Sequence, residues 1–198
     1  MSKDAKLLPA PAIQGMGSGL LLMAFFTTLW SIIAFVNLGD SVYKFGLPVF
    51  WLLAVIFTFN GVKLFSLSKQ YPPLTDEADI AKQKNMGKWF GIIFGAEGLL
   101  IFLAVNLVTN TGHIDLVIPV IALVVGLHFF PLAKVFDRTV DYYIATWATL
   151  VAICAILLTL QKTLTPNAAA VFTGIGIALA TTAYGVYMMV AGRSLVKP

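Results

Sequence analysis

Two side chains capable of acid–base chemistry, Glu97 and His128, stand inside long apolar stretches of this sequence. An acid at the centre of a bilayer costs about 2.5–3.5 kcal/mol on insertion scales and normally faces a bundle interior or water. An imidazole within reach lowers the cost of burying both groups and could relay protons. We therefore expect Glu97 and His128 to form a substrate- or ion-binding site, with Asn60 as an accessory ligand. The alternative is that these polar groups only hold helices together, at about 0.6 kcal/mol per hydrogen bond.

Residues near Glu97 and His128 affect how closely helices can pack and whether the helix backbone bends. Gly91, Gly95 and Gly98 surround Glu97 with small side chains, and Gly91 and Gly95 have the spacing that lets another helix approach closely. Pro131 has no N–H, so it leaves the carbonyl of Leu127 free one turn earlier. We expect helix packing at the glycines, and at Pro131 a kink with a small polar space beside His128.

Composition indicates where these residues lie. Hydrophobic residues make up 59% of the chain and charged residues only 11%, and the mean hydropathy is +0.90. About a quarter of the residues of a soluble domain are charged. A soluble chain of 198 residues could not bury this much apolar surface, so its main partner is the lipid bilayer. The net charge of +4 comes from dispersed lysines rather than a patch, so we expect no nucleic-acid partner.

Six continuous apolar stretches are long enough to cross a membrane as helices, which need about 20 residues each. They lack the alternation of a membrane β-barrel. The predicted fold is an all-α integral membrane protein, a six-helix transmembrane bundle forming one domain over 1–198. The predicted spans are 15–37, 45–66, 88–109, 114–135, 142–161 and 167–191. A connection at 67–87 separates the second span from the third, and Thr75 followed by acids could begin a short surface helix there.

Positive charge predicts the orientation. With the N-terminus inside, eleven of the 13 lysines and arginines fall on the inner side and only Lys44 and Lys162 on the outer. This bias is typical of cytoplasmic loops, so we expect both termini and the 67–87 loop in the cytoplasm. The inner group is Lys3, Lys6, Lys63, Lys69, Lys82, Lys84, Lys88, Lys134, Arg138, Arg193 and Lys197.

Several specific kinds of cofactor, metal or catalytic site do not fit the residues of this sequence. His113 and His128 are fifteen residues apart, or about 22 Å along a helix, which is too far to share a haem iron. Two histidines and one acid at mid-membrane are too few for a catalytic zinc, and no phosphate-binding loop or hydrolase motif is present. Cys154 is the only cysteine, so no intramolecular disulfide can form. We expect neither cofactor nor metal.

Glu97, followed at 126–133 by the octapeptide GLHFFPLA, resembles a pattern found in small multi-span prokaryotic membrane proteins of uncharacterised function. The similar region, 89–143, covers a little over a quarter of the chain. The resemblance implies that Glu97 and His128 belong together, and that the protein lies in the cell (inner) membrane of a prokaryote. It implies no substrate.

Three functions remain open. The first is a transporter or a proton- or cation-coupled permeation protein using Glu97, His128 and Asn60. The second is a non-catalytic subunit, scaffold or sensor whose glycine-rich face binds a partner helix, either from another membrane protein or from a second copy. The third, ranked last, is a membrane-embedded enzyme that acts on a lipid-like substrate with His128 and Asp137 or Asp141. A cavity open to lipid near His128 would favour this enzyme.

Overall fold

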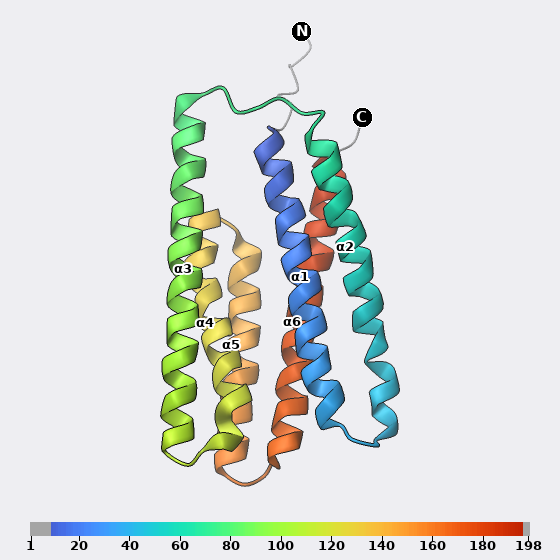
Figure 1. Ribbon diagram of the computed structural model, residues 1–198, viewed down its shortest axis with the longest axis vertical. Helices are drawn as coiled ribbons and strands as arrows, with labels where there is room; N and C mark the ends of the chain where they lie inside the picture. The colour runs from blue at the N-terminus through green and yellow to red at the C-terminus, as the bar shows by residue number, and fades with distance from the viewer. Residues whose placement is uncertain (1–8, 196–198) are drawn as a thin grey trace.

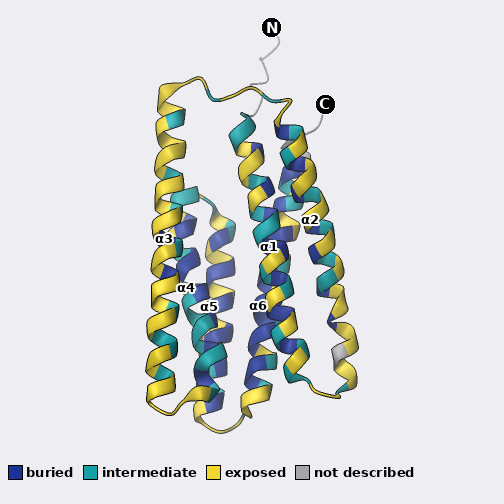
Figure 2. Cartoon of the chain, in the orientation of Figure 1, coloured by how far each residue is buried: buried dark blue, intermediate teal, exposed yellow. Residues whose placement is uncertain are grey.

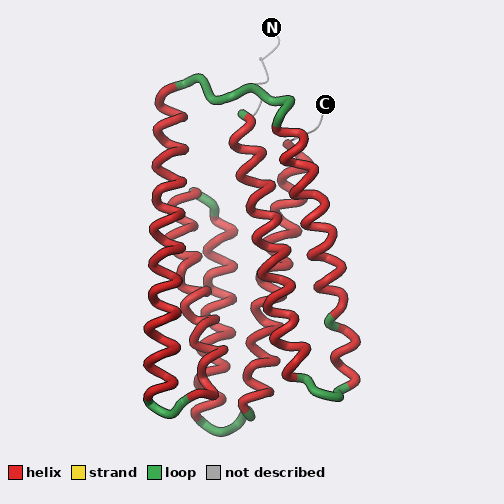
Figure 3. The backbone as a smooth tube through the Cα atoms, viewed as in Figure 1, coloured by secondary structure: helices red, strands yellow, loops and turns green. Residues whose placement is uncertain are grey.

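Six long helices cross from one end of the molecule to the other in the computed structural model, which describes residues 9–195 (Figure 1). Two 3-10 turns precede α2 and α4, and the described residues include no strand (Figure 3). The elements are α1 Ala10–Asn37, η1 Val42–Gly46, α2 Pro48–Ser68, α3 Glu77–Asn110, η2 Ile114–Leu116, α4 Val117–Phe136, α5 Thr139–Leu160 and α6 Pro166–Leu195. Each of the six predicted spans overlaps one long helix, so the prediction of an all-α chain with six helices long and apolar enough to cross a membrane is confirmed.

Local sequence signals explain where several helices begin. Prolines occupy the first turns of α1 and α2 and the first position of α6, where no N–H is needed. Asp76 is the N-cap of α3, and its side chain accepts a 2.8 Å hydrogen bond from the N–H of Ala78. The sharp turn between α4 and α5 passes through Asp137, which has a left-handed φ of 52°.

The connection predicted at 67–87 is shorter in the structure, because α3 already begins at Glu77. The first turns of α3 therefore project beyond the end of α4 (Figure 1). We call the end of the bundle with the start of α1 and the close of α6 the N/C end; the 69–76 connection lies there as well. The predicted inner lysines Lys3, Lys6 and Lys197 lie outside the described residues.

The helices pack as an open series, in the order α3, α4, α5, α6, α1, α2. Glycines allow the closest approaches: a Cβ on Gly61 would lie 3.0 Å from the carbonyl oxygen of Gly17, and a Cβ on Gly174 only 2.8 Å from that of Trp30. The helix α3 is the exception, because it packs mainly against α4. Only 11% of its most apolar stretch is buried, against 61% for α6. Helix α3, at one end of the series, is therefore only loosely attached to the rest of the bundle.

The outer surface of the bundle is apolar. Large side chains such as Leu99, Phe102 and Leu107 are exposed along α3, and exposed residues follow the outward faces of the other helices as well (Figure 2). All six long helices have the length and apolar composition needed to cross a membrane. The chain is therefore consistent with an integral, multi-pass membrane protein whose exposed apolar faces contact lipid.

Candidate functional site

Glu97 of α3 and His128 of α4 meet between their two helices. The Nδ1 atom of His128 lies 3.3 Å from Oε1 of Glu97, and each side chain is only 8% exposed. Because α3 and α4 are consecutive and antiparallel, residues on their facing sides meet at the same depth. The structure thus brings these two predicted site residues into contact.

The pair lies deep within the bundle. Glu97 is 13 residues before the end of α3 at Asn110, or about 20 Å along the helix. His128 is eight residues before the end of α4 at Phe136, or about 12 Å. Both side chains therefore lie more than two helical turns from the ends of their helices.

Aromatic rings enclose the imidazole. Its centroid lies 4.3 Å from that of Phe129 and 5.6 Å from that of Phe94, which it meets edge-on. Nδ1 of His128 makes no hydrogen bond with a described residue, so its contact with Glu97 is close but not directed. A carboxyl and an imidazole at this distance can exchange a proton after a small rotation of either side chain.

A cavity of about 690 Å³ extends from the N/C end to His128. Its walls come from α1 and α6 on one side and from α3 and α4 on the other, and Leu74 of the 69–76 connection lies at its N/C end. The helices α1 and α3 line opposite walls without packing closely on each other, since α3 packs on α4 and η2. Among the described residues Glu97 does not line the cavity, so His128 separates Glu97 from it.

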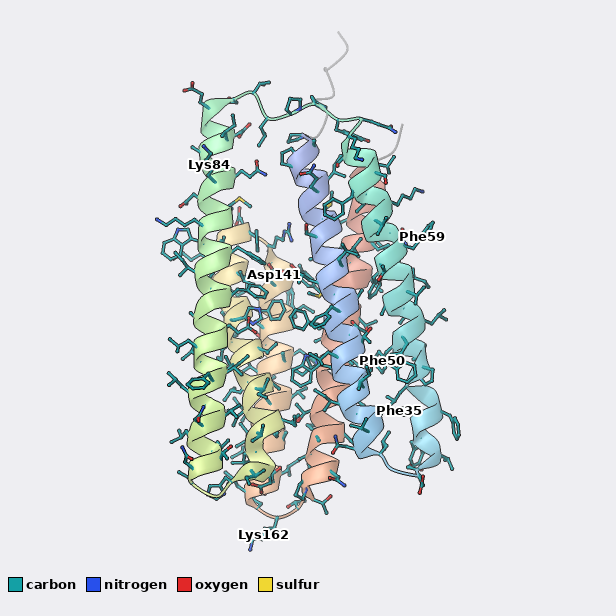
Figure 4. The ribbon with its side chains drawn as sticks, viewed as in Figure 1. Phe35, Phe50, Phe59, Lys84, Asp141 and Lys162 are labelled. Atoms are coloured by element: carbon teal, nitrogen blue, oxygen red, sulfur yellow. The ribbon has the colours of Figure 1, made fainter. Side chains whose placement is uncertain are left out.

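Three polar side chains that line the cavity gather where the α4–α5 turn meets α6: Asp141, Arg138 and Tyr184. Arg138 donates a 3.4 Å hydrogen bond to the hydroxyl of Tyr184, and its guanidinium lies 5.0 Å from the centre of the Phe136 ring. Asp141 lies in the first turn of α5, among the helices of the bundle (Figure 4). Its side chain is buried, with 1% of the residue exposed. This polar cluster lies nearer the N/C end than His128, because it involves the start of α5 and the last turn of α4.

Asn60 is not part of the Glu97–His128 group. It lies on α2, which packs against α1 and α6, and it lines a second, smaller pocket together with Lys63. Its side-chain amide donates a 2.8 Å hydrogen bond to the carbonyl of Ile56 in its own helix. The predicted grouping was wrong on this point, because depth along the membrane was inferred from sequence whereas the neighbours of α2 were not.

The glycines of α3 do not pack against a helix within the described chain. Gly91, Gly95 and Gly98 are exposed, and a Cβ on any of them would meet no atom within 4 Å. The expected helix packing at these three positions is therefore absent from the described structure. Close helix contacts instead involve glycines elsewhere, such as Gly126 against the backbone of α5.

Pro131 and Asp137 also lie away from the contact between Glu97 and His128. Pro131 stands within a helix that continues to Phe136, and both Pro131 and Leu127 are exposed whereas His128 is buried. The carbonyl that Pro131 frees is thus on the outward face of α4, not beside the imidazole. Asp137 forms the left-handed C-cap of α4 and, unlike Asp141, does not line the cavity.

Sequence reasoning missed Arg138 and Tyr184, and considered Asp141 only as an enzyme residue. Little in the sequence indicated this cluster, because Arg138 and Asp141 lie in a charged segment typical of an ordinary turn between two spans. Tyr184 stands one turn after the polar pair Thr181 and Thr182, inside an otherwise apolar span. Only the packing of α6 against α4 and α5 brings its hydroxyl to the turn.

Comparison with known proteins found no matching family model, no matching curated protein and no matching solved structure. In residues 9–195, no group of three or more His, Cys, Asp or Glu side chains is arranged to hold a metal ion. Any functional conclusion therefore depends on the geometry of the site itself.

Proposed function

We propose that this protein is a small membrane transporter or permeation protein in which Glu97 and His128 bind the coupling proton or cation. The observation that carries the proposal is the 3.3 Å contact between their side chains where the cavity ends. A carboxyl buried at this depth is costly, and such groups in membrane proteins commonly mark ion or proton pathways.

The arrangement supports an ordered path for the ion. A proton that enters the cavity from the N/C end reaches His128 before Glu97, because the imidazole lines the cavity and Glu97 lies beyond it. His128 then passes the proton to Glu97, which is neutralised within the contact between α3 and α4. Neutralising the acid removes the cost of keeping a charge there and favours movement of the weakly packed α3.

The charge distribution gives the proposed direction of access. Most described basic residues lie at the N/C end, so we place that end, with both termini and the cavity entrance, in the cytoplasm. The cell (inner) membrane of a prokaryote is the proposed location. The residues concerned are Lys63, Lys69, Lys82, Lys84, Lys88, Lys134 and Arg138.

A flux assay with matched variants tests the proposal. Proteoliposomes that contain pyranine receive a pH gradient, and its rate of collapse is followed in sodium, potassium or choline chloride. Glu97→Gln should reduce the protein-dependent rate at least tenfold. Glu77→Gln should leave it unchanged, because Glu77 is exposed at the start of α3. A folded Glu97→Gln protein with wild-type flux, or a wild-type protein no faster than empty liposomes in all three salts, would contradict the proposal.

A second candidate, a non-catalytic membrane subunit, is favoured by the open face of α3. Gly91, Gly95 and Gly98 leave room for another membrane helix, from a second copy or another protein, to approach the backbone closely. Affinity purification in mild detergent tests this candidate. A stoichiometric companion lost on Gly95→Leu supports the subunit, whereas a monodisperse monomer with no companion removes it.

A further inference from the structure

The polar cluster on the cavity wall contains a carboxylate whose capacity for hydrogen bonds is unused. Asp141 is 1% exposed, yet neither of its carboxylate oxygens has a hydrogen-bond partner among the described residues. An ionised carboxylate can accept about four hydrogen bonds, and buried polar groups in native proteins are nearly always paired. Asp141 therefore needs an explanation beyond the packing of the bundle.

The usual structural roles do not account for Asp141. An acid in the first turn of a helix often bonds to a free backbone N–H there, but the carboxylate of Asp141 bonds to none. Arg138 and the Tyr184 hydroxyl are near neighbours of Asp141. Arg138 forms no ion pair with the acid, because its guanidinium donates to the Tyr184 hydroxyl and lies against the ring of Phe136. The Tyr184 hydroxyl could supply at most one of the four hydrogen bonds that a carboxylate can accept. The acid thus remains available to a cationic hydrogen-bond donor that enters from the cavity.

The remainder of the cavity suits an apolar body attached to such a donor. Six aromatic rings line it, and aromatic faces attract ammonium groups as well as apolar groups. Four methionines on α1, α3 and α6 add flexible apolar side chains that adapt to ligands of different shape. The rings belong to Phe26, Phe90, Phe94, Phe129, Phe136 and Tyr184.

We propose that the cavity binds an amphiphilic amine. Its protonated amino group donates hydrogen bonds to Asp141, and its apolar body lies along the aromatic wall toward His128. The space between α1 and α3, where these helices do not pack closely, admits the apolar part. The ammonium group comes either from a free hydrophobic amine or from an aminophospholipid headgroup.

This inference deepens the proposed function by naming a substrate class, and its transport step rests on that function. Binding, however, can be measured without flux. A Glu97→Gln protein should lose flux and still bind the amine, because Glu97 does not line the cavity among the described residues. Failure of the binding experiment and failure of the flux experiment are therefore distinguishable.

The test compares octylamine with octanol, which has the same apolar body and no charge, by calorimetric titration of the purified full-length protein in maltoside micelles. Wild-type protein should bind octylamine at least tenfold more tightly than octanol. Asp141→Asn should remove this difference, whereas Glu77→Gln should retain it, because Glu77 is an exposed acid that does not line the cavity. Equal affinity for octylamine and octanol in the wild type, or undiminished preference in Asp141→Asn, would overturn the proposal.

A second pair of variants covers the case in which Asp141→Asn does not fold. Gly15 and Gly91 are both exposed helical glycines with open space around them, but only Gly15 lines the cavity. Gly15→Trp should weaken octylamine binding at least fivefold, and Gly91→Trp should not change it. If Gly15→Trp binds octylamine like the wild type, the amine does not occupy this cavity.

A competition arm identifies the source of the amine. Dioleoyl phosphatidylethanolamine carries a primary ammonium, whereas dioleoyl phosphatidylcholine has the same acyl chains and no N–H donor. Displacement of octylamine by the first lipid and not by the second assigns the site to a lipid headgroup. Displacement by neither assigns it to free amines, and equal displacement by both shows that Asp141 does not recognise an N–H donor and overturns the proposal.

Discussion

The contact between Glu97 and His128 predicts a measurable coupling energy. We would replace Glu97 by Gln and His128 by Asn, singly and together, and measure the free energy of unfolding by dodecyl sulfate titration in mixed micelles. Both substitutions keep the polar character and approximate size of the side chain. The difference between the double variant and the sum of the single variants isolates the interaction between the two groups.

Its expected magnitude follows from the geometry. Two unit charges 3.3 Å apart would attract by about 5 kcal/mol at an effective dielectric constant of ~20. Neutral polar pairs between membrane helices contribute about 0.6 kcal/mol on average and about 1.7 kcal/mol at most. Because both side chains are buried and Nδ1 makes no hydrogen bond with a described residue, we expect the pair to be neutral, with Glu97 in its proton-loaded form, and its coupling to be about 0.5–1.5 kcal/mol.

The control cycle uses Glu77→Gln with His113→Asn, since both residues are exposed and lie near opposite ends of α3. Its coupling should be zero within error. A value below about 0.3 kcal/mol for Glu97 and His128 would show that their proximity carries no interaction energy. A value above about 3 kcal/mol would show that both groups are ionised, which would refute the neutral-pair reasoning.

Three further predictions concern packing, capping and water access. Gly126→Ala should lower the free energy of unfolding, measured by the same denaturation assay, by about 1–3 kcal/mol, because the new Cβ would lie 2.7 Å from the backbone of α5. Gly91→Ala is the control and should leave the free energy of unfolding unchanged, because its new Cβ would meet no atom within 4 Å. Asp76→Ala should remove about 1 kcal/mol of capping, seen as faster hydrogen exchange confined to the first turns of α3. In a background without the native cysteine, a water-soluble maleimide should label Gly15→Cys through the cavity but not the lipid-facing Leu99→Cys, and equal labelling would contradict the proposed water access.

The architecture was predictable because each span is specified locally. A continuous apolar run of about 20 residues has only one backbone conformation that satisfies its hydrogen bonds in lipid. The start of α3 was harder to predict, because the charged residues after Glu77 carry helix propensity without an apolar signal. Asp76 as an N-cap was the available clue, although the prediction placed the possible helix start one residue earlier, at Thr75.

The site was only partly predictable, since it depends on which helices become neighbours. Glu97 and His128 lie on consecutive spans, and consecutive helices usually pack together, so their contact could be anticipated. Asn60 fails the same reasoning, because α2 packs on α1 and α6 rather than on α3. The position of Tyr184 beside Arg138 joins residues 46 apart in sequence, a contact with no local signature.

The 69–76 connection between α2 and α3 limits how far the start of α3 can move away from α1. The N–H of Ala10, at the start of α1, donates a 2.9 Å hydrogen bond to the carbonyl of Pro72. From this anchor only five peptide units lead to Glu77, and fully extended they span about 17 Å. While this hydrogen bond holds, Glu77 cannot lie more than about 17 Å from Pro72, so the first turn of α3 stays tethered to the start of α1 even if the rest of α3 moves outward.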